Sequence, residues 1–285
     1  MKEVIEWQIQ IEKMLGDFYR YAAKTFAADE KLSGFLIQLA EEEFEHFCVM
    51  TDAAQYSDEK EDDSSIINVD KDSQEEIEGP FFEKGKMMAK GNLSKEQLID
   101  FIVTMEFSGV NATFLYVVHS LKGTGPKFME FAENIQKHEE SIEKFVESLP
   151  YGQKYLDRIR LFHKGGQKRL LLVDDSPVVI RTLSVIFGRE FIIETAENGE
   201  EGLKKAQDQY FDVIISDMEM PFFNGMDFYN KAVQTDPRIG ERFLFFIGTV
   251  SPKLSDFFLS KNLRNLQKPA SIKKLKQTVN EIVQS

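Results

Sequence analysis

The chain has 285 residues, which is enough for two domains of ordinary size, and it carries a formal net charge of −13. The charge is uneven, because residues 1–167 hold 32 acidic and 19 basic side chains whereas residues 168–285 hold 16 of each. A nucleic-acid-binding domain needs a basic face. Neither half contains a dense cluster of Lys and Arg, so we expect no nucleic-acid partner.

The sequence favours a cytoplasmic protein. No run of eighteen apolar residues is present, and the first ten residues are charged and helix-like, so we expect neither a membrane span nor a signal peptide. The single cysteine, Cys48, has no partner for an internal disulfide, which fits a reducing compartment.

The first two predicted elements are amphipathic helices, over Glu3–Ala28 and over about Lys31–Ala54. Glu12 falls on the apolar face of the first helix, and Glu43 and His46 fall on that of the second. The Glu-x-x-His spacing places both side chains on one helical face, where they can share a ligand. A carboxylate on a core face is costly unless it is paired or bound to a metal. These three side chains are therefore candidate metal ligands.

Residues 55–79 form the most acidic and least hydrophobic segment of the chain. Such a composition is typical of chain that does not bury a core, so we predict a mobile or loosely packed crossover. A charged interaction surface is the alternative.

Two further helices are predicted over Ser94–Leu121 and Lys127–Leu149. The first of these is apolar on nearly all sides and is expected to be largely buried, with Glu106 on its most enclosed side. Residues 150–167 contain a short helical pattern followed by a Gly-Gly break, which predicts an interdomain linker.

The four helices, the long connection between the second and the third, and the inward-facing acids resemble the ferritin-like, rubrerythrin-type four-helix bundle. That resemblance implies a carboxylate di-metal site. The side chains that match it on three of the helices are Glu12, Glu43, His46 and Glu106.

The fourth helix departs from the family pattern. The best alignment puts His138 where the family has Glu, and Ser141 where it has His. We therefore expect at most one metal ion, iron or another divalent cation, with His138 as a possible further ligand. The alternative is a metal-free network of buried polar groups that satisfy one another, together with Tyr19 and water.

Short apolar runs in the last third of the chain predict buried strands of a parallel sheet, and polar side chains follow them. Asp174 and Asp175 follow the first run, Asp217 follows a second, Thr249 a third and Lys268 a fourth. Ligands bind at the carboxyl ends of strands in open α/β sheets, so we expect these side chains to converge. Three carboxylates suit Mg²⁺, and a lysine and a hydroxyl beside them suit a phosphoryl group.

Residues 168–285 resemble a response-regulator receiver domain of two-component signalling. The resemblance implies a flavodoxin-like fold with a parallel sheet in the order 2-1-3-4-5. It also implies that Asp217 is the phosphoacceptor, that Asp174 and Asp175 bind Mg²⁺ with it, and that Thr249 and Lys268 contact the phosphoryl group.

The receiver-like segment departs from the family at two positions. Asn265 stands where many members carry an aromatic switch residue, and Val250 stands where a small residue is usual. We therefore expect phosphorylation without the usual threonine–aromatic relay. The resemblance itself implies a cis bond between Lys268 and Pro269.

The sequence thus predicts a ferritin-like bundle over residues 1–149, a linker over residues 150–167 and a receiver domain over residues 168–285. The first functional hypothesis is a response regulator phosphorylated by a histidine kinase or phosphotransfer protein, with the bundle as sensor, adaptor or output. The alternatives make the bundle a phosphorylation-regulated, metal-dependent oxidase or peroxidase, or a metal-free dimerisation module. The first hypothesis leaves the chain without enzymatic turnover beyond its own phosphorylation and dephosphorylation.

Overall fold

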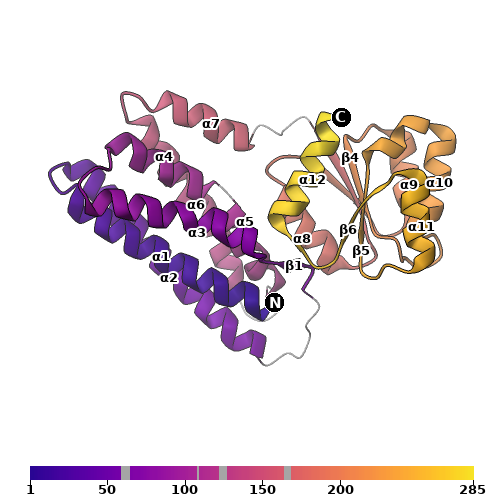
Figure 1. Cartoon of the computed structure of the whole chain (residues 1–285), viewed down its shortest axis with the longest axis horizontal. Coiled ribbons are helices and arrows are strands. Elements are labelled where there is room, and N and C mark those ends of the chain that lie inside the picture. The colour runs from indigo at the N-terminus through magenta and orange to yellow at the C-terminus, as the bar shows by residue number, and fades with distance from the viewer. Residues whose placement is uncertain (59–64, 108, 122–126, 164–167) are drawn as a thin grey trace. The chain divides into compact units, whose positions relative to one another are not determined.

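The computed structural model describes residues 1–58, 65–107, 109–121, 127–163 and 168–285 (Figure 1). The chain divides into two compact units. The first contains Met1–Ser64 and Asn68–Phe162, and the second contains Ser65–Ile67 and His163–Ser285. Within the described ranges, no helix is long and apolar enough to cross a membrane.

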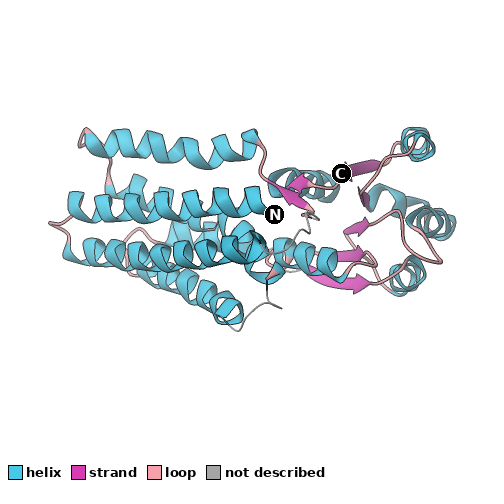
Figure 2. Ribbon diagram, turned by 90° about the horizontal axis from the view of Figure 1, so that it is seen from below, coloured by secondary structure: helices cyan, strands magenta, loops and turns pink. Residues whose placement is uncertain are grey.

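The first unit is built from helices that run side by side (Figure 2). Helix α1 spans Lys2–Thr25 and α2 spans Glu30–Asp58. The turn between them is fixed by Asp29, whose carboxylate accepts a hydrogen bond from the amide of Leu32 at 3.1 Å. The core contains the apolar faces of both helices, with Ile11, Leu36 and Leu39 completely buried.

The acidic crossover is shorter than predicted. Helix α2 continues to Asp58, and an unpredicted helix, α3, spans Lys71–Ala89. Asp70 caps α3 by accepting a hydrogen bond from the amide of Ser73 at 2.9 Å. Phe81 and Met88 lie on the buried side of α3, so a charged segment with few apolar residues still forms an amphipathic helix. Residues 59–64 of the crossover lie outside the described residues.

The single helix predicted over Ser94–Leu121 is two helices. Helix α4 spans Lys95–Glu106 and begins with a capping box between Ser94 and Gln97. Helix α5 spans Gly109–Ser120, and a glycine has low helix propensity, which favours a break at this point. Helix α6 spans Lys127–Glu147.

The segment predicted as a linker contains helix α7, Gln153–His163. Tyr155 and Ile159 of this helix are buried in the core of the first unit. Arg158 donates hydrogen bonds to the side chain and the carbonyl of Asp100 in α4, at 2.7 and 2.9 Å. Helix α7 is therefore packed as part of the helical unit. The assignment of this unit to the ferritin-like fold remains a prediction.

The second unit is a five-stranded parallel sheet with the strand order β3-β2-β4-β5-β6. When the strands are renumbered from one, beginning with β2, this order becomes 2-1-3-4-5, as predicted. The strands are β2 (Arg169–Val173), β3 (Ile192–Ala196), β4 (Val213–Ser216), β5 (Phe243–Ile247) and β6 (Arg264–Gln267). Every residue of β4 and β5 is buried, which explains why these strands read as continuous apolar runs.

Helices cover both faces of this sheet, α8 and α12 on one face and α9, α10 and α11 on the other (Figure 1). Their bounds are α8 (Pro177–Phe187), α9 (Gly199–Asp208), α10 (Gly225–Thr235), α11 (Pro252–Lys261) and α12 (Ile272–Gln284). A 3-10 turn, η1, spans Pro237–Arg242 before β5.

Residues Ser65–Ile67 of the crossover belong to the second unit. Strand β1, Ile67–Asn68, pairs with β7, Ala270–Ser271. The amide of Ala270 donates to the carbonyl of Ile66 at 3.1 Å, and Ile66 and Ile67 are both buried. This part of the predicted crossover is packed rather than loose, because its two isoleucines leave water when the strands pair.

Gly225, the first residue of α10, offers a stability test. A Cβ placed on this glycine would collide with the backbone oxygen of Asp217, and backbone cannot move aside as a flexible side chain does. Gly225→Ala should therefore lower the free energy of unfolding by about 1–3 kcal/mol, measured by urea denaturation. Gly248→Ala is the matched control, since a Cβ at Gly248 has no heavy atom within 4 Å. Equal stability of the two variants would contradict this packing.

Candidate functional site

Side chains that follow three strands of the second unit meet at the carboxyl edge of its sheet. Asp174 follows β2, Asp217 follows β4 and Lys268 follows β6. The Lys268 Nζ lies 2.8 Å from Asp174 Oδ2 and 2.7 Å from Asp217 Oδ1. One ammonium group thus joins two carboxylates that are 43 residues apart in the sequence.

The second oxygen of each carboxylate is held by the turn that follows it. Asp174 Oδ1 accepts a hydrogen bond from the amide of Ser176 at 2.9 Å, and Asp217 Oδ2 accepts one from the amide of Glu219 at 2.7 Å. Both carboxylates are therefore oriented by backbone as well as by Lys268. Such fixed oxygens are the kind of donor that a hard cation requires.

Burial and the neighbouring charges together shift the pKa values of Asp174 and Lys268. Burial raises the pKa of Asp174, and the ammonium of Lys268 opposes that rise only in part. Burial alone would lower the pKa of Lys268, but the charges of Asp174 and Asp217 outweigh it and raise the pKa. Lys268 therefore stays protonated at neutral pH. It is the single cation in contact with the two acids among the residues that the structure describes.

Asp175 and Thr249 lie at the same edge but are exposed to solvent. Asp175 follows Asp174 directly, and Thr249 lies two residues beyond the end of β5. Neither side chain makes a hydrogen bond to Asp174, Asp217 or Lys268 in the described part of the chain. Their predicted roles toward Mg²⁺ and the phosphoryl group remain predictions.

Asn265 and Val250, where the sequence departs from the receiver pattern, are both exposed. The peptide bond between Lys268 and Pro269 is cis, as predicted. Asn265 is an exposed residue of β6, and its side-chain amide donates to the carbonyl of Leu263 at 3.4 Å. No aromatic ring occupies this position. Val250 is exposed, with 41% of its surface open to solvent.

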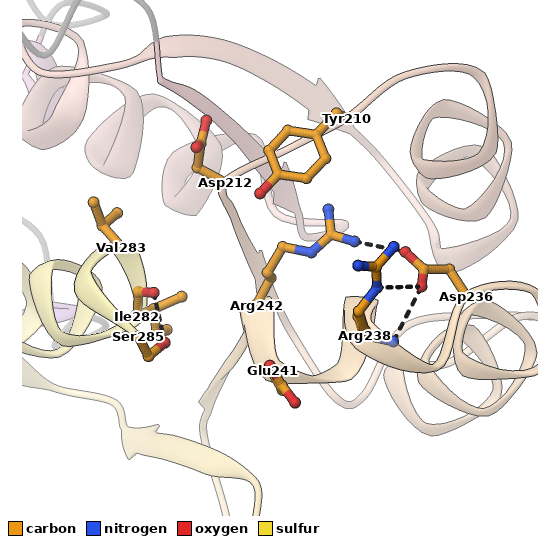
Figure 3. A pocket seen from close by; sticks show the side chains of 9 residues that line it. All are labelled: Tyr210, Asp212, Asp236, Arg238, Glu241, Arg242, Ile282, Val283 and Ser285. Atoms are coloured by element: carbon orange, nitrogen blue, oxygen red, sulfur yellow. Dashed lines mark hydrogen bonds and ion pairs between the residues drawn. The ribbon is translucent and has the colours of Figure 1, made fainter.

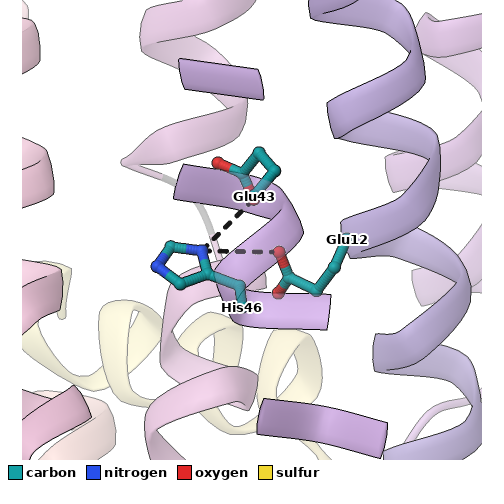
Figure 4. A group of neighbouring side chains, drawn as sticks. All are labelled: Glu12, Glu43 and His46. Carbon is teal, nitrogen blue, oxygen red and sulfur yellow. Dashed lines mark hydrogen bonds and ion pairs between the residues drawn. The ribbon is translucent and has the colours of Figure 1, made fainter. Parts of the chain in front are cut away.

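The first unit contains a second concentration of titratable groups, all of them buried. It is formed by Glu12 of α1, Glu43 and His46 of α2, Glu106 of α4 and His138 of α6. His46 Nδ1 lies 3.3 Å from Glu43 Oε2 and 3.6 Å from Glu12 Oε2 (Figure 4). The structure thus brings together all five side chains that the sequence predicted as ligands.

His138 links the fourth helix to this cluster. Its Nε2 lies 2.9 Å from Glu106 Oε2, and its Nδ1 lies 2.6 Å from Glu42 Oε2. Sequence reasoning missed Glu42, because it selected Glu43 alone from the acidic run of α2. Tyr19 was predicted as a partner of the network, and its hydroxyl does donate a hydrogen bond to Glu106.

Within the cluster, the carboxylates and the imidazole rings shift one another's pKa values. Burial would lower the pKa of His138, but the nearby Glu106 and Glu42 raise it to about 10. The pKa of His46 is also raised, since Glu12 outweighs the effect of burial. Burial, together with Glu106 and Glu12, holds the pKa of Glu43 well above its usual range. His138 is therefore expected to be an imidazolium ion in the metal-free protein at neutral pH, and the pKa shifts of His46 and Glu43 favour a charged imidazole and a neutral carboxyl.

The donor set nevertheless fits a divalent cation. Two overlapping groups, Glu12–Glu43–His46 and Glu43–Glu106–His138, each place three possible ligand atoms within 4.8 Å of one another. Oxygen Oε1 of Glu43, the residue common to both groups, is buried and has no hydrogen-bond partner. A buried oxygen left unsatisfied costs free energy that coordination of a cation would recover.

A cavity of about 330 Å³ lies at the other edge of the sheet, beside Asp212 before β4 and Arg242 before β5 (Figure 3). The Arg242 guanidinium donates to Asp236 at 2.8 Å and lies 4.4 Å from the ring centre of Tyr210. The charged groups Arg242 and Asp236 that line the cavity are thus paired with each other. The cavity is separated from Asp217 by the length of the strands and takes no part in the phosphoryl site.

Comparison with known proteins places the C-terminal segment in a family. Residues 170–280 match the response regulator receiver domain. A 69-residue segment is 44% identical to the protein-glutamate methylesterase/protein-glutamine glutaminase of Bacillus subtilis, and covers 23% of this chain and 19% of that protein. A 75-residue segment is 36% identical to the response regulator GacA of Pseudomonas viridiflava, and covers 25% of this chain and 35% of that protein.

Solved structures give similar coverage. A CheY-like response regulator receiver domain protein from Methanospirillum hungatei is 26% identical, with a TM-score of 0.39, and is matched over 41% of this chain and 94% of its own. The chemotaxis protein CheY4 of Vibrio cholerae is 29% identical, with a TM-score of 0.38, over 40% of this chain and 98% of its own. The chain spans about a third or less of the length of the curated relatives named above. The C-terminal unit, matched over residues 170–280, is a response regulator receiver domain of two-component signalling.

Proposed function

We propose that this protein is a response regulator that is phosphorylated on Asp217 by a histidine kinase or phosphotransfer protein. The observation that carries the proposal is the double ion pair of Lys268 with Asp217 and Asp174 at the carboxyl edge of the sheet. The Lys268 ammonium thus lies beside an oxygen of Asp217, which follows the central strand β4. An incoming phosphoryl group would find a positive charge beside the oxygen that attacks it.

The reaction is a phosphoryl transfer between a donor and a carboxylate. An oxygen of Asp217 forms a bond to phosphorus as the bond from phosphorus to the donor breaks, and the donor leaves with the electron pair. Asp174, Asp175 and Asp217 would hold Mg²⁺, which supplies neutralisation of the phosphoryl oxygens when bound. Lys268 would then pair with the new phosphoryl oxygens, since its ammonium is within reach of Asp217.

Asp217 is tested by its substitution. Acetyl phosphate with Mg²⁺ should add one phosphoryl group to the wild-type protein, detected by intact mass, and Asp217→Ala should remove this labelling. Asp227→Ala, at an exposed position of α10, is the control and should label as the wild type does. Full labelling of Asp217→Ala would contradict the assignment. Asp175→Asn should weaken Mg²⁺ binding while leaving the acceptor oxygen in place.

We further propose that the buried cluster of the helical unit holds one divalent cation, with this unit serving as a sensory, adaptor or output module. Support comes from Glu43 Oε1, which accepts no hydrogen bond and lies 3.6 Å from His138 Nε2, and from the mixture of carboxylate and imidazole donors, which suits iron, zinc or nickel. Glu12, Glu43, Glu106, His46 and His138 would supply the ligands. Ser141, where the family has histidine, leaves a second ion short of donors.

Metal content gives a direct test of the cluster. Protein expressed with iron available should carry at most one metal ion per chain by elemental analysis, and Glu43→Gln should lose it. Glu45→Gln, an exposed position of the same helix, should keep the wild-type content. The two possible ligand groups share Glu43, so a second ion could bind beside the first. Two metal ions per chain together with peroxide-driven turnover would be the opposing result. That result would favour the oxidase or peroxidase alternative.

The histidine charge in the metal-free protein predicts a pH dependence. His138 has a folded-state pKa of about 10, above its ordinary value of 6.5, so its stabilising contribution is complete below about pH 6.5. The contribution is lost as the pH rises through 10. In the presence of EDTA, the difference in unfolding free energy between wild type and His138→Gln should therefore shrink from pH 6.5 to pH 10. A difference that stays constant over this range would show that His138 is neutral.

A further inference from the structure

The two histidines of the buried cluster present different ring nitrogens to Glu43. His46 Nδ1 lies 3.3 Å from Glu43 Oε2 (Figure 4). His138 instead places Nε2 3.6 Å from Glu43 Oε1 and 2.9 Å from Glu106 Oε2. The second nitrogen of His138, Nδ1, lies 2.6 Å from Glu42 Oε2. The contacts of His138 with Glu42 and with Glu43 therefore depend on one orientation of its ring.

Glu42 lies beside the cluster rather than inside it. Glu42 and Glu43 are neighbours on α2, so their side chains leave the helix about 100° apart. The side chain of Glu43 is 1% exposed, whereas that of Glu42 is 27% exposed. Among the described residues, neither possible ligand group contains Glu42. Glu42 is thus placed to act on His138 and not on a cation directly.

Both oxygens of Glu42 are already engaged. Oε1 accepts a hydrogen bond at 2.8 Å from Nε2 of Gln38, one turn earlier on α2. Oε2 faces His138 Nδ1. An ionised carboxylate has no hydrogen to donate, so the hydrogen in this contact belongs to Nδ1 of the histidine. With Nδ1 committed to Glu42, Nε2 is the nitrogen of His138 that can offer a lone pair to a cation.

The oxygen that Nε2 faces is one that accepts no hydrogen bond. This oxygen, Glu43 Oε1, is buried. Glu43, Glu106 and His138 place three possible ligand atoms within 4.8 Å of one another. A cation among these atoms would meet Nε2 only when the ring of His138 is turned as its contact with Glu42 requires.

We propose that Glu42 is a positioning residue for the cation of the helical unit, which holds His138 by Nδ1 so that Nε2 faces Glu43 and Glu106. The inference rests on the proposed binding of one divalent cation by this cluster. The ferritin-like resemblance places a glutamate at position 138, and a glutamate has no second ring nitrogen to hold. The role of Glu42 therefore belongs to the departure of this chain from that pattern.

Histidines that bind metals commonly donate their other ring N–H to a carboxylate, which fixes the ring and makes the bound nitrogen more basic. Loss of such a carboxylate weakens metal affinity by about 10–100-fold. The contact between Glu42 and His138 joins α2 to α6, so it fixes a ligand of one helix from another. Removal of Glu42 should therefore weaken cation binding although all five ligands remain.

Zinc affinity tests this role on the full-length protein. Metal is first removed with EDTA, and Zn²⁺ binding is then measured by competition with a chelator of known affinity. Glu42→Ala should weaken zinc binding at least about tenfold. Glu42→Gln should weaken it less, because a glutamine oxygen can still accept the hydrogen bond from His138 Nδ1. Glu41→Ala, which removes the same charge at an exposed position of α2, should bind zinc as the wild type does.

The nitrogen that His138 uses gives a readout that a loss of stability alone would not move. Spectra of the zinc-loaded protein with ¹⁵N-labelled histidine distinguish a ring nitrogen that carries a proton from one that binds zinc, and His138→Gln assigns the signals. In the wild type and in Glu42→Gln, Nδ1 of His138 should carry the proton and Nε2 should bind zinc. In Glu42→Ala, His138 should no longer show this single form.

Two results would overturn the role of Glu42. One is zinc binding by Glu42→Ala at the affinity of the wild type, and the other is coordination of zinc through Nδ1 of His138 in the wild type. If circular dichroism shows that Glu42→Ala is unfolded, the spectra of the wild type and of Glu42→Gln decide. Failure of the wild type to bind zinc would instead contradict the proposed cation site.

Discussion

The interaction on which the proposed chemistry depends is the contact of a single ammonium group with two carboxylates. Asp174 and Asp217 end different strands, and two buried carboxylates at one edge would repel each other without a cation between them. Lys268, which follows a third strand, lies within 2.8 Å of both. The order of the parallel strands is what brings these three strand ends together. A phosphoryl group on Asp217 would add roughly two negative charges beside Lys268. This change in the charge around Lys268 is a physical basis for a signal.

The helical unit handles buried charge by a different arrangement. Its acids come from three helices, and two imidazole rings lie among them in place of a lysine. Histidine can balance the acids as an imidazolium ion, or bind a metal once it is neutral. The same side chains therefore support either a metal-free ion network or a cation site. Glu43 belongs to both possible ligand groups, and its Oε1 accepts no hydrogen bond.

The sequence predicted the strands of the receiver domain more completely than the helices of the first unit, for a physical reason. A strand that is buried on both faces appears in the sequence as an unbroken apolar run. The polar residue that follows the run, such as Asp217 after β4, can therefore be identified from the sequence. Helical periodicity placed Glu12 on an inward face, and alignment with the ferritin-like pattern selected His138. Neither could reveal that His138 reaches Glu42, because that contact depends on side-chain conformation across two helices. Helix α3 was missed since its charged composition hid an apolar face.

The central claim is that Asp217 accepts the phosphoryl group, and chemical trapping tests it most directly. Borohydride reduces an aspartyl phosphate to homoserine, which peptide mass spectrometry locates in the chain. After phosphorylation with Mg²⁺ and reduction, we predict homoserine at position 217, with Asp174 and Asp175 unchanged. Homoserine at either of those acids, or at none of the three after full labelling of the protein, would contradict the account.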